Sequence, residues 1–459
     1  MNEDSTFYEG SSPSELKVWG IIKRVRLVPT VAPVLSVILA LAPASWAASK
    51  FKTLYAFQGG TDGATPFGRL LFDQAGNLYG ATNGGGTNAN YCTGLINGCG
   101  TVFELKAGSD GSWQELVLHR FQENDSSDGS GPNGGMILDN AGNLYGTTSS
   151  GGGSNQQCSS GAGAGCGIVF ELSPAQGEWT ETVLYRFQND GGGAGPDGDL
   201  LFDKAGNLYG TAAAGGNCCR AIFGWGAGVA FELTPGSRNW SESVLYTFCS
   251  QTNCSDGNAP YAGLIRGASG ILYGTTAYGG SNSFPCEGLG CGTVFQFVES
   301  GGWKEKLLYT FTGRDDGAQP GAALTLDSHG NLYGTTSANG PFGFGTVFKL
   351  SRCEHGRWHY EVLYSFRTGT TYGSFATRPV FDKVGNLYGT IFTGGDGLVY
   401  KLAPSPHGKW KYSVVHTFSG GADGGFPGAD LLRDDKGNLY GSAEIGGTAG
   451  YGVVFEITP

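Results

Sequence analysis

The sequence predicts an all-β protein: a seven-bladed β-propeller with four-stranded blades, closed by an N-terminal strand that joins the last blade. Three observations support this prediction. One sequence unit is repeated seven times along the chain. Each unit contains four short segments with the composition of β-strands. The chain begins with the last segment of a unit and ends one segment short of completing another.

The repeat is clearest in the pentapeptide G-N-L-Y-G. Successive copies are 52 to 66 residues apart, and a variant at 270–274 reads G-I-L-Y-G. Self-similarity at a fixed period of this kind is the signature of propellers and other repeat folds. The other six copies lie at 76–80, 142–146, 206–210, 330–334, 385–389 and 437–441.

Each unit holds four segments, named A to D here in chain order. Segment A has the form L-L-F-D, as at 200–203, and segment B is G-N-L-Y-G-T-T. All four are rich in β-branched and aromatic residues and are bounded by Gly, Asp, Asn or Pro, so each is predicted to be a strand. Segment C, of the form G-T-V-F-E-L, occurs at 100–105, 167–172, 228–233, 292–297, 345–350, 397–402 and 452–457. Segment D, of the form W-x-x-x-V-L-Y-x-F, occurs at 51–57, 113–121, 179–187, 240–248, 303–311, 358–366 and 410–418.

The phase of the repeat predicts how the ring closes. One four-stranded unit cannot bury both of its faces, but seven units stacked radially can. If segment A is the innermost strand, the last unit lacks its strand D, and residues 51–57 supply it by pairing with 452–457. A β-solenoid is the alternative, and it would have shorter and more uniform repeats.

The composition excludes several classes of protein. Glycine makes up 83 of 459 residues, about 18% against an average near 7%, yet it has no third-residue period, so the chain is not collagen. Aromatic residues at 12% argue against disorder. The 39 acidic and 28 basic residues give a net charge of −11, which argues against binding a nucleic acid backbone.

Residues 1–47 are interpreted as an N-terminal extension followed by an export signal, and residues 48–459 as the propeller domain. A basic segment at 23–26 precedes an uncharged apolar stretch at 27–42, and Ala47 ends a small-residue cleavage site. An uncleaved membrane anchor is the alternative, but the stretch is short and contains proline. Residues 1–20 are too polar for an ordinary signal and are consistent with a start codon assigned too early. We expect no membrane span after cleavage.

The cysteines agree with export. Eight of the eleven form four local pairs, which we expect to be disulfides in an oxidising compartment. Zinc is disfavoured because no C-x-x-C occurs and histidine is scarce near the pairs. The pairing of Cys218 and Cys219 stays open, and Cys353 is the candidate free thiol. The predicted pairs are Cys92 with Cys99, Cys158 with Cys166, Cys249 with Cys254, and Cys286 with Cys291.

The recurring G-N-L-Y-G-T-T, G-T-V-F-E-L and V-L-Y-x-F-x-x-x-x-D-G segments resemble the bacterial Gloeo/Verruco (GloVer) tandem repeat. The resemblance covers residues 51–459. It implies an exported protein, often with a surface-anchoring tail, and it does not imply any particular activity. Because the sequence ends on the last strand, we expect a periplasmic or extracellular protein, with anchoring by an uncleaved signal as the alternative.

Two repeated polar motifs are interpreted as turns. D-x-x-G-N, as at 73–77, could be a cation loop, but a motif repeated in every unit favours a tight turn in which Asp accepts backbone amide bonds. D-G-x-x-P, before segment A, is interpreted in the same way. His119 and His416 replace a repeated Tyr and are interpreted as packing residues. No metalloprotease, nucleophile-elbow or phosphate-loop motif is present, so no metal and no cofactor are predicted.

The loops between segments B and C vary most in length, and we expect them on one face of the disc. Those of the first four units are long and carry cysteines, whereas those of the last three are short. Variable loops on a rigid scaffold commonly bind ligands, although neutral insertion explains them equally well. Four aromatic residues in or near these loops could stack on sugars or could form small loop cores. They are Tyr91, Trp225, Phe284 and Phe344.

A column of residues in segment A supplies the best polar cluster. Because units 6, 7 and 1 are neighbours in the ring, Arg378, Asp430 and Arg69 are predicted to stand side by side near the channel mouth. Guanidinium beside carboxylate can orient sugars or organic acids, or can simply seal the blades. The column, four residues before the Asp that ends segment A, reads Arg69, Gly135, Asp199, Gly263, Ala323, Arg378 and Asp430.

The first functional hypothesis is an exported propeller, expected to be a monomer, that binds a glycan, a small polar ligand or an envelope protein. Its candidate ligand-binding residues are Arg69, Arg378, Asp430, Asp199 and Trp225. A carbohydrate lyase or hydrolase is the second hypothesis, and a structural envelope module the third. Hydrolysis needs two carboxyl groups at a defined separation. Asp199 and Asp430 are the candidates, and the distance between units 3 and 7 in the ring lowers the enzyme hypothesis.

Overall fold

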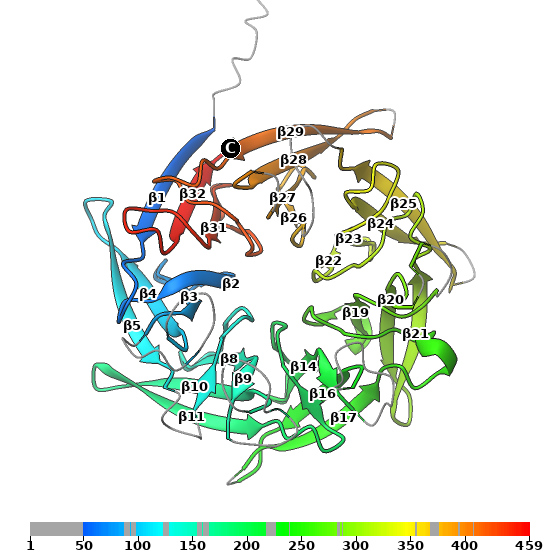
Figure 1. The fold of residues 1–459 in the computed structure, drawn as a ribbon, viewed down its shortest axis with the longest axis horizontal. Coiled ribbons are helices and arrows are strands. Elements are labelled where there is room, and N and C mark those ends of the chain that lie inside the picture. The colour runs from blue at the N-terminus through cyan, green and yellow to red at the C-terminus, as the bar shows by residue number, and fades with distance from the viewer. Residues whose placement is uncertain are drawn as a thin grey trace, which may run out of the picture. The chain divides into compact units, whose positions relative to one another are not determined.

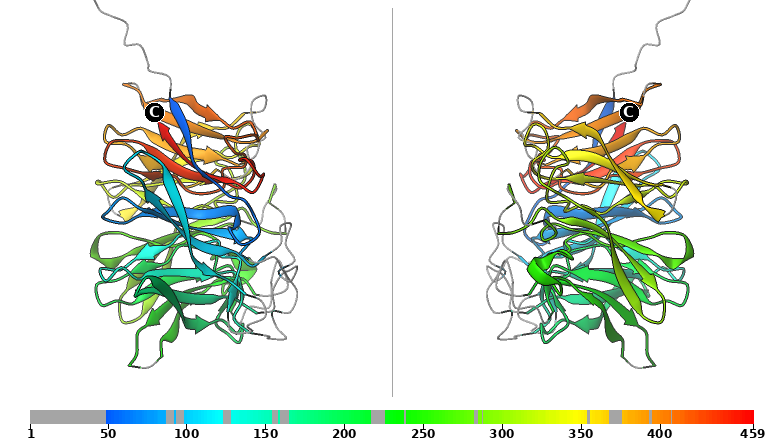
Figure 2. Two further views of the ribbon diagram at one scale, coloured as in Figure 1. Left: turned by 90° about the vertical axis from the view of Figure 1, so that its left-hand side faces the viewer. Right: turned by 90° about the vertical axis from the view of Figure 1, so that its right-hand side faces the viewer.

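The protein forms a ring of seven antiparallel four-stranded sheets, as predicted (Figure 1). Figure 2 shows the same ring from its edge, as a disc. The computed structural model describes residues 49–459 except for several short segments, and Ala47–Pro459 form one compact unit. The predicted export signal, within residues 1–47, therefore lies outside the described residues. The segments left undescribed are 87–91, 93–97, 123–127, 154–157, 159–164, 217–225, 238, 282–284, 287, 354–355, 368–375, 393–394 and 407.

The blades follow one another along the chain, and each is built from its innermost strand outward. Blade 1 contains β2 (Ala64–Phe72), β3 (Leu78–Gly84), β4 (Thr101–Ala107) and β5 (Trp113–Arg120). Blade 2 contains β7 (Ile137–Leu138), β8 (Leu144–Thr148), β10 (Ile168–Ala175) and β11 (Glu178–Arg186). Blade 3 contains β13 (Leu201–Phe202), β14 (Leu208–Ala212), β16 (Val229–Thr234) and β17 (Ser241–Thr247). Blade 4 contains β18 (Ile265–Arg266), β19 (Leu272–Thr276), β20 (Thr293–Glu299) and β21 (Trp303–Thr310).

The remaining blades follow the same plan. Blade 5 contains β22 (Thr325–Leu326), β23 (Leu332–Thr336), β24 (Thr346–Arg352) and β25 (Trp358–Ser365). Blade 6 contains β26 (Val380–Phe381), β27 (Leu387–Ile391), β28 (Leu398–Pro404) and β29 (Trp410–Thr417). Blade 7 contains β30 (Leu432–Arg433), β31 (Leu439–Ala443), β32 (Val453–Thr458) and β1 (Lys50–Ala56). Small additions are the ribbons β6 (Gly129–Ser130) with β9 (Ser150–Gly151) and β12 (Gly193–Ala194) with β15 (Ala214–Gly215), and the 3-10 turns η2 (Thr252–Cys254) and η3 (Ala268–Gly270).

The N-terminal strand closes the ring. β1 pairs antiparallel with β32 from Lys50 opposite Thr458 to Ala56 opposite Val453. Figure 1 shows β1 as the outermost strand of the blade that also contains the C-terminus. The last blade is therefore shared by the two ends of the chain, as the repeat phase predicts.

The repeated glycine in the middle of strand B is required by close packing. In blade 3, Gly210 lies opposite Phe231 of the neighbouring strand, and a Cβ at Gly210 would lie 2.5 Å from the Cζ atom of that ring. Phe231 is completely buried. The aromatic ring thus fills the space that the glycine leaves open, and the same pair recurs in every blade, with Tyr400 as the ring in blade 6.

The D-x-x-G-N motif is a turn, as interpreted from the sequence. In the first copy, the Asp73 carboxylate accepts hydrogen bonds from the backbone amides of Ala75 and Asn77, at 2.8 and 2.9 Å, and from the side chains of Asn77 and Tyr79. Partial burial opposes ionisation, but these bonds hold the pKa of Asp73 below its ordinary value. Since local donors occupy both carboxylate oxygens, the motif has a structural role.

All four predicted disulfides are present. They indicate an oxidising, exported environment. Cys353 is a free and exposed thiol, whereas Cys218 and Cys219 lie outside the described residues. Within the part of the chain that the structure describes, no helix has the length and apolar character needed to cross a membrane.

The seams between blades are of two kinds. We define a seam as strand D of one blade, the loop that follows it, and strand D of the next blade. In three seams, aromatic rings of the two D strands stack on each other. The ring centroids are 4.1 Å apart between blades 4 and 5, 4.6 Å between blades 5 and 6, and 4.2 Å between blades 6 and 7. In the other four seams, a partly buried glutamate on strand D of the next blade faces the aspartate of the loop. These seams lie between blades 7 and 1, 1 and 2, 2 and 3, and 3 and 4. These glutamates are Glu115, Glu181, Glu242 and Glu305.

The seam glutamates lead us to expect a protein that is more stable at pH 5 than at pH 8. Burial, followed by the nearby aspartate, raises the pKa of Glu115 to about 8 and of Glu181 and Glu305 to about 7. The folded state therefore binds more protons than the unfolded state between pH 4.5 and about 8, and stability falls as pH rises through this window. Thermal unfolding at each pH measures the effect.

The control is the double variant Glu115→Gln, Glu305→Gln. An amide can donate to the aspartate as a protonated carboxyl does, but it does not titrate, so the pH dependence should become shallower. A melting temperature that rises from pH 5 to pH 8 in the unaltered protein would contradict the prediction.

Candidate functional site

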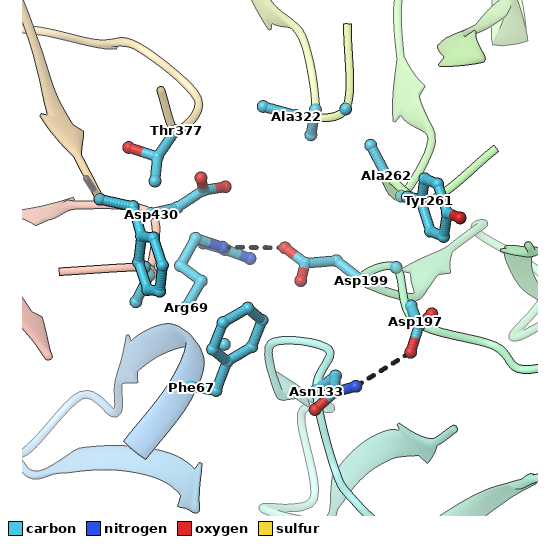
Figure 3. A pocket seen from close by; sticks show the side chains of 18 of the residues that line it. Phe67, Arg69, Asn133, Asp197, Asp199, Tyr261, Ala262, Ala322, Thr377 and Asp430 are labelled. Carbon is cyan, nitrogen blue, oxygen red and sulfur yellow. Dashed lines mark hydrogen bonds and ion pairs between the residues drawn. The ribbon is translucent and has the colours of Figure 1, made fainter. Parts of the chain in front are cut away.

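A cavity of about 460 Å³ lies on the axis of the ring (Figure 3). Its volume is within the range of about 300–1,000 Å³ that is usual for small-molecule sites. Every blade contributes to its wall, mainly through a triplet of residues that lies just before the innermost strand in blades 2 to 7 and within β2 in blade 1. These triplets are 67–69, 133–135, 197–199, 261–263, 321–323, 376–378 and 428–430.

The first and third residues of a triplet can both face the axis because side chains alternate along an extended chain. In blade 3 the pair is Asp197 and Asp199, and both line the cavity. The third position of the triplet is the column aligned in the sequence, whereas the first position was not predicted. The missed side chains with functional groups are Asn133, Asp197 and Tyr261, together with the Phe67 ring. Each of these four residues directly follows a proline that recurs in the repeat. A variable residue after a recurring proline was therefore the sequence pattern that could have identified them.

Arg69 and Asp199 form an ion pair inside the cavity. The Arg69 Nε atom donates to Asp199 Oδ2 at 3.0 Å, and the two side chains are 24% and 20% exposed. The backbone amide of Gly135 donates to the other oxygen of Asp199 at 2.6 Å. Burial favours the neutral acid, but Arg69 and this amide hold the pKa of Asp199 below its ordinary value. Asp199 is therefore an oriented, ionised carboxylate.

Asp430 lines the same cavity from blade 7. Its Oδ1 atom accepts a hydrogen bond of 2.9 Å from the backbone amide of Arg378. The Arg378 side chain turns toward blade 5, where its Nε atom donates to Thr325 Oγ1 at 3.2 Å. Arg378 thus adjoins Asp430 as predicted, but its side chain is not part of the cavity wall, whereas those of Arg69 and Asp430 are.

The expectation that Asp199 and Asp430 lie too far apart to share a site is wrong. Both line one cavity, with Arg69 extending between them in Figure 3. The physical reason is that the innermost triplets converge on the axis, so blades that are not neighbours at the rim meet at the centre.

Burial makes two other carboxyl groups weaker acids than Asp199. It raises the pKa of Asp430 to about 6, with Arg378 opposing the shift and Asp199 adding to it. It also raises the pKa of Asp197 to about 6, against the hydrogen bond of 3.0 Å that Asn133 donates. One cavity therefore contains a firmly ionised carboxylate and two that titrate just below neutral pH.

The rest of the wall is apolar or small. Phe67, Tyr261 and Phe392 supply rings, and blades 5 to 7 supply mostly glycine and alanine. Glu444 adjoins this side: its Oε1 atom would lie 2.7 Å from a Cβ at Gly428, and burial raises its pKa to about 7. Glu444 was not identifiable from the repeat pattern, because it lies in a B–C loop outside the aligned columns.

The loop aromatics do not extend this site in the described structure. Trp225, Tyr91 and Phe284 lie outside the described residues. Phe344 packs against the hydrophobic core near blade 6. It therefore has the packing role that was the alternative to stacking on a sugar.

Several solved structures are similar to this chain at a low level. A gluconolactonase from Xanthomonas campestris is 13% identical, with a TM-score of 0.39 and coverage of 80% of this chain and 90% of that chain. The PQQ-bound aldose sugar dehydrogenase from Streptomyces coelicolor is 10% identical, with a TM-score of 0.42 and coverage of 89% and 98%. A putative 6-phosphogluconolactonase from Bacteroides uniformis is 13% identical, with a TM-score of 0.44 and coverage of 77% and 87%.

No curated protein matches the chain. The model of the Gloeobacter/Verrucomicrobia repeat matches residues 157–396, which is more than half of the sequence. The same repeat unit continues on both sides of this region and forms all seven blades. The chain therefore belongs to the Gloeobacter/Verrucomicrobia repeat family.

Proposed function

We propose that this protein binds a small polyhydroxylated ligand, such as a sugar or sugar acid, in the axial cavity. The observation that supports this most strongly is the composition of the wall. Charged hydrogen-bonding groups occupy one part of it, and three aromatic rings with small residues occupy the rest. Sugars present hydroxyl groups at their edges and apolar C–H faces, so they need both kinds of surface.

Each polar group has a distinct capacity toward such a ligand. Asp430 accepts one protein hydrogen bond, at Oδ1, and no described residue donates to its Oδ2 atom. Asp197 is engaged by Asn133 at Oδ1. These carboxylates can accept bonds from ligand hydroxyls. Arg69 uses Nε for Asp199, which leaves its terminal nitrogens on the cavity side to donate.

The proposed setting is the periplasm or the extracellular medium. The four disulfides favour such a compartment over a reducing one. A sugar-binding role there is compatible with an envelope or released protein, and a glycan chain that presents its end to the cavity is included in the proposal.

A second candidate function is carbohydrate hydrolysis or elimination. It is favoured by the difference in pKa between Asp199, which is held ionised, and Asp430 at about 6. Carboxyl groups whose environments separate their pKa values are suited to act as base and acid. In this case protonated Asp430 would donate its proton to the leaving-group oxygen, and ionised Asp199, oriented by Arg69, would act as the base.

We expect Asp430→Asn and Arg69→Ala each to weaken binding by about 1.5–3 kcal/mol, which is the range for hydrogen bonds to charged groups. Affinity for sugars and sugar acids, followed by turnover of any ligand that binds, is the measurement. Melting temperature is recorded for each variant. The matched control is Arg357→Ala, which removes an exposed arginine from the turn between β24 and β25, outside the cavity wall.

Three outcomes distinguish the hypotheses. Lost affinity with little change in melting temperature supports the binding function. Turnover that is abolished in Asp430→Asn supports the enzyme. Lower stability with unchanged affinity would mean that the ion pair only seals the blades, and would contradict both.

A further inference from the structure

The seam between blades 1 and 2 carries a cluster that the axial cavity does not use. His119 lies on β5, Glu181 on β11, and Asp128 in the loop between the blades. One ligand atom from each residue lies within 4.8 Å of the other two. The three groups therefore come from two different blades and one connecting loop, and they converge at a single point.

Two of these groups are buried without a hydrogen-bonding partner. The His119 Nε2 atom and the Glu181 Oε1 atom are both inaccessible to solvent and unpaired in the described structure. His119 Nε2 lies 3.5 Å from Asp128 Oδ1, which is too long for a good hydrogen bond. Two ligands of a tetrahedral zinc ion at 2.0–2.1 Å are separated by roughly 3.3–3.4 Å, so the spacing suits a shared cation.

Asp128 is fixed in place before any ligand arrives. Its side chain is 7% exposed. The backbone amide of Gln122 donates to Oδ2 at 2.8 Å, and that of Gly129 donates to Oδ1 at 2.7 Å. Backbone donors of this kind orient carboxylate ligands in metal sites.

The other seams provide an internal comparison. Where His119 stands, three of them have a tyrosine whose hydroxyl donates to the loop aspartate: Tyr55 to Asp62 at 2.7 Å, Tyr246 to Asp256 at 2.8 Å, and Tyr309 to Asp316 at 2.9 Å. In those seams the tyrosine and the aspartate satisfy one another, although the Oε1 atoms of Glu115 and Glu305 are buried and unpaired as that of Glu181 is. In the seam between blades 1 and 2, His119 replaces the tyrosine hydroxyl and forms no equivalent bond, so the unpaired histidine is what distinguishes this seam.

The seam between blades 6 and 7 contains a histidine but no glutamate. His416 Nε2 lies within hydrogen-bonding distance of Asp423, at 3.1 Å, and Phe51 occupies the position of Glu181 and stacks on the imidazole. That seam has two possible ligands and a satisfied histidine. Among the described residues, only the seam between blades 1 and 2 combines histidine, aspartate and glutamate.

We propose that His119, Asp128 and Glu181 bind a divalent transition-metal ion, with Zn²⁺ as the preferred ion, and that the ion links blades 1 and 2. One imidazole nitrogen and two carboxylate oxygens form a three-ligand set that zinc accepts, with water in the fourth position. Hard cations that need six or more oxygen ligands fit this set less well.

The test is zinc binding to the protein after removal of any affinity tag, treatment with a chelator and blocking of free thiols, including Cys353. Calorimetric titration with ZnCl₂ should give one site per chain, and zinc should raise the melting temperature. His119→Tyr should weaken binding at least tenfold, since even the loss of an outer partner of a metal ligand costs about 10–100-fold. Tyrosine is the residue of most other repeats, so this variant should fold.

His416→Tyr is the matched control and should bind zinc as the unaltered protein does. The reciprocal variant Tyr246→His places a histidine beside Asp256 and Glu305 and should add a second zinc site. Failure of the unaltered protein to bind zinc would overturn the proposal, as would equal affinity in His119→Tyr. These outcomes do not depend on whether the axial cavity binds a sugar.

Discussion

A chain that begins at residue 58 should fail to form a stable monomer. Without β1, the strand Val453–Thr458 becomes an exposed edge whose backbone groups have lost their partners. Such an edge pairs with other chains. The core would also lose Phe57, which is completely buried. We therefore expect aggregation or a much lower melting temperature, measured by size-exclusion chromatography and thermal unfolding.

The control is a chain that begins at Ser49 and retains all of β1. It should behave as the mature protein does, which separates the effect of the strand from that of the preceding residues. If the chain that begins at residue 58 stays monomeric with an unchanged melting temperature, ring closure by β1 does not contribute to stability.

Phe231→Ala should lower the free energy of unfolding by about 3–5 kcal/mol, the range for deletion of a buried aromatic ring. The reason is specific to this fold. Phe231 fills the space above Gly210, and a smaller side chain leaves a cavity between two strands of blade 3. Urea unfolding of the variant and of the unaltered protein measures the loss.

Gly210→Ala provides the complementary measurement. In the unaltered background the new Cβ would approach Phe231 Cζ to 2.5 Å, so the variant should be destabilised. In the Phe231→Ala background the same change should cost less or should stabilise, because space is available. Additive effects of the two substitutions would show that ring and glycine do not pack as a unit.

The fold was predictable because its determinants are local and repeated seven times. Strand composition, turn residues and the incomplete last unit each appear in the sequence, and β1 pairs with β32 as the repeat phase requires. The D-x-x-G-N turn was predictable for the same reason, since its hydrogen bonds link residues at most six positions apart.

The cavity was predictable only in part. Alignment of the repeats identified Arg69, Asp199 and Asp430, because they occupy one column. It could not show that Asp199 and Asp430 meet, since the width of the channel depends on how all seven blades pack. It also could not show that the Arg378 side chain leaves the axis to bond Thr325, because a rotamer is not encoded in a repeat pattern.

The sharing of blade 7 between the two chain ends has a consequence for how the protein folds. The pairing of Lys50 with Thr458 joins residues at opposite ends of the described chain. Contacts between distant residues form slowly, because a long loop must close before they are gained. During synthesis or export, β1 cannot pair with β32 until that final strand has emerged. Blades 1 to 6 can assemble earlier, so the open ring is the intermediate that we expect to accumulate and to need protection from aggregation.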